Sequence, residues 1–338
     1  MDYIAVASTM NHFWEQYWKI AAHIPARSFT SSIRELPLVK SLPGLKLIRH
    51  NTSTNSQVTS FLRANFRKGP FSPLYIYQAY PQEILLTVCD TNDAIVGSVR
   101  LRPAGTFEEN RVHLIDAFCI RPDWRRKGIG SYLLNQIHHA AAAEGVHHAI
   151  FLKEGRPLDI TGLLPLYSST YVCRPTSAAA GAAATATATA ATPLLAREID
   201  TALAKTLLYS YTMLRPDTFL ILNWETTNQK WFHYRAGESA WILACIQNSH
   251  QQFKDEMRPI GWMTGWIESP AITEEDRYKA AIDICSAAGA YYNWVWMDSR
   301  WPGVTCSNTD FMIDGTFHWY TYQWSTGLIP GRSYCIMS

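Results

Sequence analysis

The fold is decided by residues 113–134, which read HLIDAFCIRPDWRRKGIGSYLL. Residues 112–120 are a mostly apolar run of the kind that forms a buried strand. After Trp124 the apolar residues return at helical spacing, at positions 129, 133, 134 and 137. The stretch therefore predicts a buried strand, a short basic loop and the first turns of a helix.

The loop at residues 125–130 has the composition of a pyrophosphate site. A helix N-terminus offers unpaired amide groups and the positive end of the helix dipole. Gly128 and Gly130 let the backbone approach a ligand, and Arg125, Arg126 and Lys127 add local positive charge. The loop matches neither the Walker A pattern nor the dinucleotide pattern GxGxxG. The alternative is a basic, solvated helix start whose glycines serve packing.

The bulk properties limit the class of protein. A chain of 338 residues predicts two domains, and a net charge of only +2 argues against a nucleic-acid partner or an anionic membrane. The N-terminus lacks signal-peptide features and no long apolar run predicts a membrane span, so we expect a cytoplasmic protein, and we expect it to be a monomer. The seven scattered cysteines contain no CxxC pair, which favours reduced thiols and no metal site.

An alanine- and threonine-rich segment divides the chain. Residues 177–193 predict a linker between an N-terminal domain at 1–176 and a C-terminal domain at 194–338. Helices are expected at 56–66, from 129 onward, at 196–211 and at 274–288. Strands are expected at 74–79, 84–89, 94–101, 112–120, 146–152, 218–224, 239–247, 292–297 and 317–324. Both halves thus predict an α/β (α+β) fold, with a mixed sheet flanked by helices.

The motif at residues 113–134 resembles the acyl-CoA motif of the GCN5-related N-acetyltransferase (GNAT) superfamily. This resemblance implies that the strand before the loop splays away from its neighbour and binds the acyl thioester through exposed backbone N–H groups. It also implies an acyl-CoA co-substrate, no metal, and direct attack of an amine on the thioester.

Further segments resemble the eukaryotic N-myristoyltransferases, which contain two GNAT-like folds in one chain. Residues 116–120 are similar to their Asn-Phe-Leu-Cys-Val strand, residues 145–151 to their Gly-Ile-x-x-Ala-x-Tyr strand, and residues 12–14 to their Lys-Phe-Trp. Residues 314–324 resemble their Gly-Asp-Gly segment and the aromatic run after it. The implied function is transfer of an acyl group, myristoyl in that family, from acyl-CoA to the N-terminal glycine of a protein or peptide.

The resemblance assigns roles to particular residues. The backbone amides of Ala117 and Phe118 would form the oxyanion hole, and the α-carboxylate of Ser338 would be the base. The residues implied to bind the cofactor are Phe13, Trp14, Phe118, Cys119, Ile120, Arg125, Arg126, Lys127, Gly128, Ile129 and Gly130. The substrate side departs from the family, because its acidic loop is replaced by the basic residues 66–71.

Two alternatives remain open at this point. An acetyltransferase using acetyl-CoA would take Tyr167 as acid and Asp116 as base. An inactive, diverged copy, such as a large DNA virus could carry in the host cytoplasm, would be a binding or structural protein. A set of aromatic residues could line a peptide groove or acyl pocket, although most are expected in the core: Trp262, Trp266, Tyr291, Tyr292, Trp294, Trp296, Trp301, Trp319 and Trp324.

Overall fold

The computed structural model describes residues 29–50, 56–66, 73–158, 165–176, 195–215, 217–226, 228–254 and 256–337. The predicted linker at 177–193 and the site residues Phe13, Trp14 and Ser338 lie outside these ranges. Within them, no helix is both long enough and apolar enough to cross a membrane.

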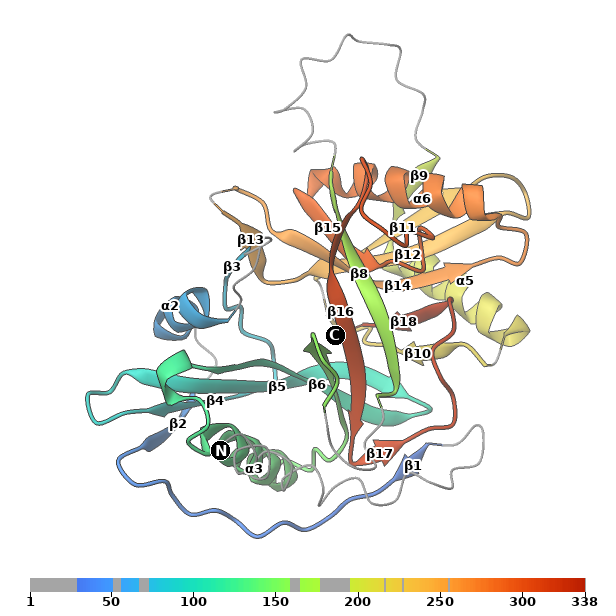
Figure 1. Cartoon of the computed structure of the whole chain (residues 1–338). Coiled ribbons are helices and arrows are strands. Elements are labelled where there is room, and N and C mark those ends of the chain that lie inside the picture. The colour runs from blue at the N-terminus through green and yellow to red at the C-terminus, as the bar shows by residue number, and fades with distance from the viewer. Residues whose placement is uncertain are drawn as a thin grey trace. The chain divides into compact units, whose positions relative to one another are not determined.

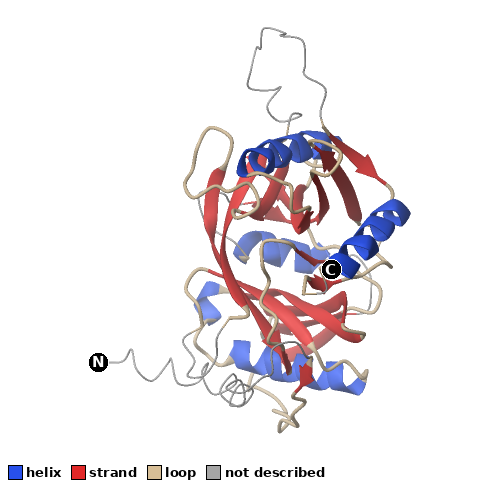
Figure 2. Cartoon of the chain, turned by 90° about the vertical axis from the view of Figure 1, so that its right-hand side faces the viewer, coloured by secondary structure: helices blue, strands red, loops and turns tan. Residues whose placement is uncertain are grey.

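The chain forms two compact units (Figures 1 and 2). Among the described residues, the first unit comprises those up to Tyr167 together with residues 318–328, and the second comprises residues 168–317 and 329–337. The boundaries of these units differ from those of the predicted segments 1–176 and 194–338. The reason is that the second half of the long strand β16 (Met312–Tyr322), near the C-terminus, belongs to the first unit.

The first unit is built on strands that pair in the order β2-β4-β5-β6-β7, followed by the second half of β16. Its helices are α2 (Ser56–Asn65), η1 (Pro122–Trp124) and α3 (Ile129–Ala143). Its strands are β1 (Thr30–Ser31), β2 (Lys46–His50), β3 (Pro73–Tyr75), β4 (Ile84–Cys89), β5 (Ile95–Phe107), β6 (Asn110–Ile120), β7 (Ala149–Glu154), β17 (Trp324–Ser325) and part of β16 (Met312–Tyr322).

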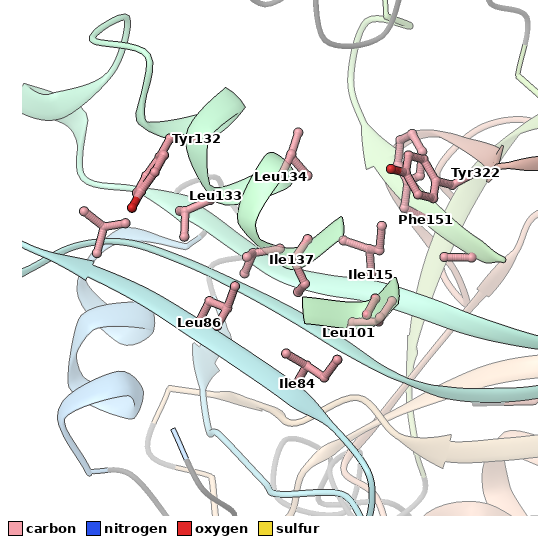
Figure 3. Packing of buried hydrophobic residues seen from close by; sticks show 14 of the residues in the cluster. Ile84, Leu86, Leu101, Ile115, Tyr132, Leu133, Leu134, Ile137, Phe151 and Tyr322 are labelled. Atoms are coloured by element: carbon pink, nitrogen blue, oxygen red, sulfur yellow. The ribbon is translucent and has the colours of Figure 1, made fainter. Parts of the chain in front are cut away.

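Helix α3 covers one face of this sheet because its apolar residues recur every three or four positions. Ile129, Leu133 and Ile137 are at most 3% exposed, as the spacing predicts, and pack on Ile84, Leu86 and other strand residues (Figure 3). Helix α2 covers the opposite face through Val58, Phe61 and Leu62, which share a core with Ala117 and Cys119 (Figure 1). Residues 117 and 119 of β6 therefore lie on the α2 face.

The strands of the second unit pair in the order β8-β15-β14-β12-β11-β9. Its helices are α5 (Thr201–Leu214), α6 (Glu274–Ala287) and η2 (Ala288–Ala290). Its remaining elements are β8 (Tyr167–Pro175), β9 (Ala196–Ile199), β10 (Phe219–Ile221), β11 (Gln229–Arg235), β12 (Trp241–Asn248), β13 (Gln251–Phe253), β14 (Ile260–Glu268), β15 (Trp294–Asp298) and β18 (Tyr334–Ile336).

Each unit contains a strand, a helix and a parallel strand in succession. In the first unit these are β6, α3 and β7, and in the second they are β14, α6 and β15. The pairs β4–β5, β5–β6, β11–β12 and β12–β14 are antiparallel, so the strand pairing is mixed in both units. This confirms the predicted fold class, a mixed α/β arrangement with a mixed sheet and helices in each half.

One predicted helix is wrong at its start. Residues 196–199 form the strand β9 rather than the first turn of a helix at 196–211, because they pair with β11. The helix α5 begins only after Asp200, whose side chain accepts a hydrogen bond from the backbone N–H of Leu203 at 2.7 Å. The predicted capping box of Thr273 and Asp276 at the start of α6 is confirmed.

Candidate functional site

The two parallel strands β6 and β7 separate beside the motif loop at residues 125–130. Their pairing covers only three residue pairs and ends at Ile115 and Phe151, although β6 continues to Ile120 and β7 to Glu154. On its other side β6 stays paired with β5 up to Ile120. The edge of residues 116–120 that faces away from β5 is therefore not paired with β7, which is the splayed arrangement expected from the sequence.

A β-bulge interrupts β6 at this opening. Asp116 lies opposite Arg100 and Cys119 opposite Ser98, so that Ala117 and Phe118 together face the single residue Val99. Ala117 has a φ of 48°, in the left-handed region, where a side chain costs roughly 1–2 kcal/mol. Such a conformation persists only where neighbouring contacts enforce it.

Asp116 is held firmly on the β5 side of the bulge. Its carboxylate accepts hydrogen bonds from Arg100 Nε at 2.6 Å, Arg100 Nη2 at 2.8 Å and Arg102 Nε at 2.7 Å. Burial by itself would raise the pKa of Asp116, but the two guanidinium groups outweigh it and hold that pKa well below the ordinary range of an aspartate. Asp116 is therefore ionised at neutral pH and is a poor proton acceptor, which argues against its role as a base.

The start of α3 is open to an anion. Gly128 is the N-cap residue with a φ of 79°, a Cβ at this position would meet no atom within 4 Å, and no side chain caps the helix. The first turn contains no acidic residue. The helix dipole and the first amide groups are thus not neutralised by the protein's own side chains.

The basic side chains of the loop are exposed. Arg125, Arg126 and Lys127 form no ion pair with any described residue. Arg125 Nε donates to the carbonyl oxygen of Ile120 at 3.1 Å, and Lys127 Nζ lies 4.6 Å from the centre of the Trp124 ring. Arg121, by contrast, is engaged by Asp123 at 2.8 Å. None of the three loop cations is neutralised by a carboxylate of a described residue, so all three can meet a phosphate at the start of α3.

Cys119 is not suited to nucleophilic chemistry in this site. Burial raises the pKa of its thiol to about 12, so that it stays protonated at neutral pH. All seven cysteines lie in the described ranges and none forms a disulfide. Within the described residues, no three His, Cys, Asp or Glu side chains are arranged to hold a metal ion.

The structure thus brings together ten of the predicted site positions. These are the bulge, the end of β6 and the loop at the start of α3: Ala117, Phe118, Cys119, Ile120, Arg125, Arg126, Lys127, Gly128, Ile129 and Gly130. Ile129 differs from the others because it is 1% exposed and belongs to the core under α3. Its side chain therefore faces the sheet, and only its backbone can serve a ligand.

Sequence reasoning missed the residues of β5 that support the bulge. Ser98, Arg100 and Arg102 are at most 2% exposed and alternate on one face of the strand. Ser98 Oγ donates a hydrogen bond to the carbonyl oxygen of Ala117 at 2.7 Å. A signal was present, since three polar residues at alternate positions of an apolar strand must find partners when buried.

The residues considered for other roles are mostly structural. Tyr167, the candidate acid, is 6% exposed at the start of β8. The aromatic set belongs to the core as expected, except that Tyr291 and Trp294 are partly exposed. These residues therefore give no support to an aromatic peptide groove.

Comparisons with known proteins agree with this geometry. Residues 55–159 match the family model described as Acetyltransferase (GNAT) family. No sequence among the curated proteins matches the chain significantly.

Solved structures match over nearly the whole chain. A crystal structure of Saccharomyces cerevisiae N-myristoyltransferase with bound myristoyl-CoA and inhibitors covers 94% of this chain and 91% of its own, with a TM-score of 0.60 and 11% identity. A second structure of the yeast enzyme with bound myristoyl-CoA covers 95% and 90%, with a TM-score of 0.59 and 11% identity. At this identity the likeness establishes the fold, which is that of the tandem GNAT proteins.

Proposed function

We propose, from the membership of residues 55–159 in the acetyltransferase (GNAT) family, that this chain is an N-acyltransferase that uses an acyl-CoA. The observation that carries the proposal is the bulge at Ala117 and Phe118, placed at the point where β6 and β7 separate and a few residues before the uncapped start of α3. Thioester binding and pyrophosphate binding would thus take place along one continuous stretch of chain.

Each part of the stretch would bind a different part of the CoA thioester. Arg125, Arg126, Lys127 and the amide groups at residues 128–130 would hold the pyrophosphate, through charge and through the helix dipole. The free edge of residues 118–120 would bind the pantetheine arm. The amides of Ala117 and Phe118 would bind the thioester oxygen, on which negative charge grows during attack.

The reaction would be a direct acyl transfer. The amine nitrogen forms a bond to the carbonyl carbon, the carbon–sulfur bond breaks, and the CoA thiolate leaves and takes up a proton. The protonated thiol of Cys119 is consistent with a path that involves no acyl-enzyme. The α-carboxylate of Ser338 is our candidate for the base that deprotonates the amine, and this residue lies outside the described ranges.

We propose myristoyl-CoA as the donor and the N-terminal glycine of a protein or peptide as the acceptor. Support comes from the match to the yeast enzyme, which extends over both units and not only over the GNAT segment. The alternative is transfer from acetyl-CoA to another amine, which the same bulge and loop would serve.

Calorimetry and native mass spectrometry with myristoyl-CoA and acetyl-CoA test the proposal, followed by an acylation assay on a peptide with N-terminal glycine. We expect tighter binding of myristoyl-CoA and acylation of the free glycine amine, with the N-acetylated peptide as control. Equal or weaker binding of myristoyl-CoA would favour the acetyltransferase alternative. Binding of neither thioester would contradict an acyltransferase and favour a binding or structural protein.

The role of the terminal carboxylate can be tested separately. Strand β18 and the hydrogen bond from Met337 N–H to Ile221 O hold the chain up to residue 337, so that deletion of Ser338 alone leaves this packing in place. We expect the deletion to lower turnover by about a hundredfold or more, as for loss of a general base, and to spare acyl-CoA binding. Ser338→Ala keeps the α-carboxylate and is the matched control; unchanged turnover in the deletion variant would exclude this base.

A further inference from the structure

The carbonyl group of Ala117 has a dedicated partner on the neighbouring strand. Ser98 is fully buried on β5, and its hydroxyl donates to the Ala117 oxygen at 2.7 Å. The bulge takes Ala117 out of the regular pairing between β5 and β6, because it shares Val99 with Phe118. The hydroxyl therefore satisfies a carbonyl at a place where the β5–β6 ladder is irregular.

This hydrogen bond also fixes the direction of the next N–H group. The Ala117–Phe118 peptide is trans, so its carbonyl and the N–H of Phe118 point in opposite directions across one plane. Since the carbonyl is turned toward Ser98 on β5, the N–H of Phe118 is turned away from β5. That is the edge from which β7 has diverged after the last pair, Ile115 and Phe151.

The residues on either side of this peptide are anchored independently of the Ser98 hydroxyl. Asp116 is held by Arg100 and Arg102, and Cys119 lies opposite Ser98 in the resumed ladder between the two strands. Between these anchors the peptide plane can rotate, and rotation would move Ala117 away from its φ of 48°. It would also turn a carbonyl oxygen, instead of an N–H, toward the open edge.

We propose that Ser98 is a positioning residue for acyl transfer, which holds the Ala117–Phe118 peptide so that the N–H of Phe118 faces the thioester oxygen. This inference rests on the proposed function, because it assumes that the thioester binds at the bulge. Ser98 itself touches no substrate. Its effect is to keep the oxyanion donor oriented before the substrate arrives.

Two unreactive CoA analogues of equal chain length test this role. In the first analogue a methylene group replaces the sulfur, so that the thioester becomes a ketone and keeps its carbonyl. The second analogue is a thioether, which has no carbonyl. We expect the wild-type chain to prefer the ketone by a factor of up to about ten, the value of one hydrogen bond. Ser98→Ala should lose this preference and bind the thioether as well as the wild type does, while its turnover falls by about a hundredfold.

Thr87→Val is the matched control. Thr87 is also fully buried, lies directly opposite Ser98 on β4, and bonds to His50 Nε2 at 2.7 Å instead of to the bulge. This variant should keep the ketone preference. If Ser98→Ala does not fold, Ser98→Cys, whose thiol is a weak donor, replaces it in the same comparison.

The outcomes separate this inference from the proposed function. A wild-type chain that binds neither analogue, or shows no preference for the ketone, would contradict thioester binding at the bulge and hence the function. A preference that is equal in the wild type and in Ser98→Ala would overturn the role of Ser98 alone. Loss of the preference in Thr87→Val as well would also overturn it, because the effect would then belong to sheet packing in general.

Discussion

Asp116 shows how the same side chain can suggest one role in the sequence and take another in the structure. As a carboxylate inside the motif it is a natural candidate for a base. In the structure it accepts three hydrogen bonds from Arg100 and Arg102, of which Arg100 is completely buried and also donates to the carbonyl oxygen of Gln78 at 2.7 Å. The carboxylate thus compensates buried cations next to the bulge.

Replacing Asp116 by asparagine should therefore destabilise the fold. The change leaves the buried Arg102 without its carboxylate partner and Arg100 with only Glu83, 3.5 Å from its Nη1, which costs about 3–5 kcal/mol of unfolding free energy. Urea denaturation measures this loss. Asp123→Asn is the control, because Asp123 pairs with Arg121 on the exposed loop and its replacement should change the unfolding free energy little. Equal stability of the Asp116 variant and the wild type would contradict the structural role.

The same ion pairs predict a pH dependence. The pKa of Asp116 is lower in the folded chain than the value of about 3.9 of an unfolded aspartate, so its contribution to stability is fully present above that value. It is lost as the pH falls below the unfolded pKa toward the folded one. Between about pH 4 and pH 2 the unfolding free energy of the wild type should therefore fall more steeply than that of Asp116→Asn. Parallel curves for the two proteins would refute this account.

Ala117 offers a test of the left-handed backbone at the bulge. Ala117→Gly should change the unfolding free energy by less than about 1 kcal/mol, because relief of the positive φ offsets the loss of a buried methyl group. Ala117→Val should destabilise by about 2 kcal/mol or more, since β-branched residues are genuine outliers at positive φ. Thermal and urea unfolding distinguish the two, and equal effects would show that φ is not the determining factor.

Sequence reasoning reached the bulge residues but not their supports. Ala117 and Phe118 could be identified because the motif is contiguous and specific. The contacts of Ser98 and Arg100 depend on which residues of β5 face which residues of β6, and the bulge shifts this register by one. No local pattern in the sequence reveals such a shift.

The loop at residues 125–127 and the N-terminus of α3 are proposed to bind the CoA pyrophosphate together. Replacing Arg125, Arg126 and Lys127 by alanine should weaken CoA binding by about tenfold to a hundredfold at low salt, because three exposed charges near a helix N-terminus contribute a few tenths to 1 kcal/mol each. The salt dependence of the affinity should fall as well. Calorimetry at several salt concentrations measures both effects. As a control, replacing three cations of the second unit by alanine, namely Lys205, Arg215 and Arg235, should leave the CoA affinity unchanged. An equal loss of affinity in this control variant would contradict a CoA site at the loop before α3.

The elements that sequence reasoning predicted well are those with strong periodicity or a clear cap. Helix α3 and helix α6 belong to this group, the latter through Thr273 and Asp276. Strand β9 was mistaken for helix, because alanine, arginine, glutamate and isoleucine at 196–199 carry no alternation and only the pairing with β11 determines their state. Strands β8 and β11 were missed for the same reason, since both mix polar and apolar residues without a fixed period.

Both units of the molecule contain the same arrangement of a strand, a helix and a parallel strand, but the N-termini of the two helices differ in charge and in capping. In the first unit the helix after the parallel strand starts at Gly128 with no capping side chain and no acidic residue. In the second unit the corresponding helix α6 starts at Thr273, whose side chain and that of Asp276 satisfy each other's backbone N–H groups. Its first turn also carries Glu274 and Glu275. Three carboxylates at this position would repel a pyrophosphate, so of these two helix starts in the described parts of the chain, that of α3 is the one suited to the proposed CoA site.

The duplicated plan therefore predicts a single CoA for each chain. Calorimetric titration should give one binding site, and the alanine variant of Arg125, Arg126 and Lys127 should weaken that site without revealing a second. Neutralising the start of α6 with Glu274→Gln, Glu275→Gln and Asp276→Asn removes the repulsion but leaves Thr273 and the amide side chain of residue 276 able to cap the helix. This variant should still bind one CoA, because α6 has neither the glycines nor the cations of the loop before α3. Two equivalent sites in the wild type would show that the second unit kept the ligand as well as the fold.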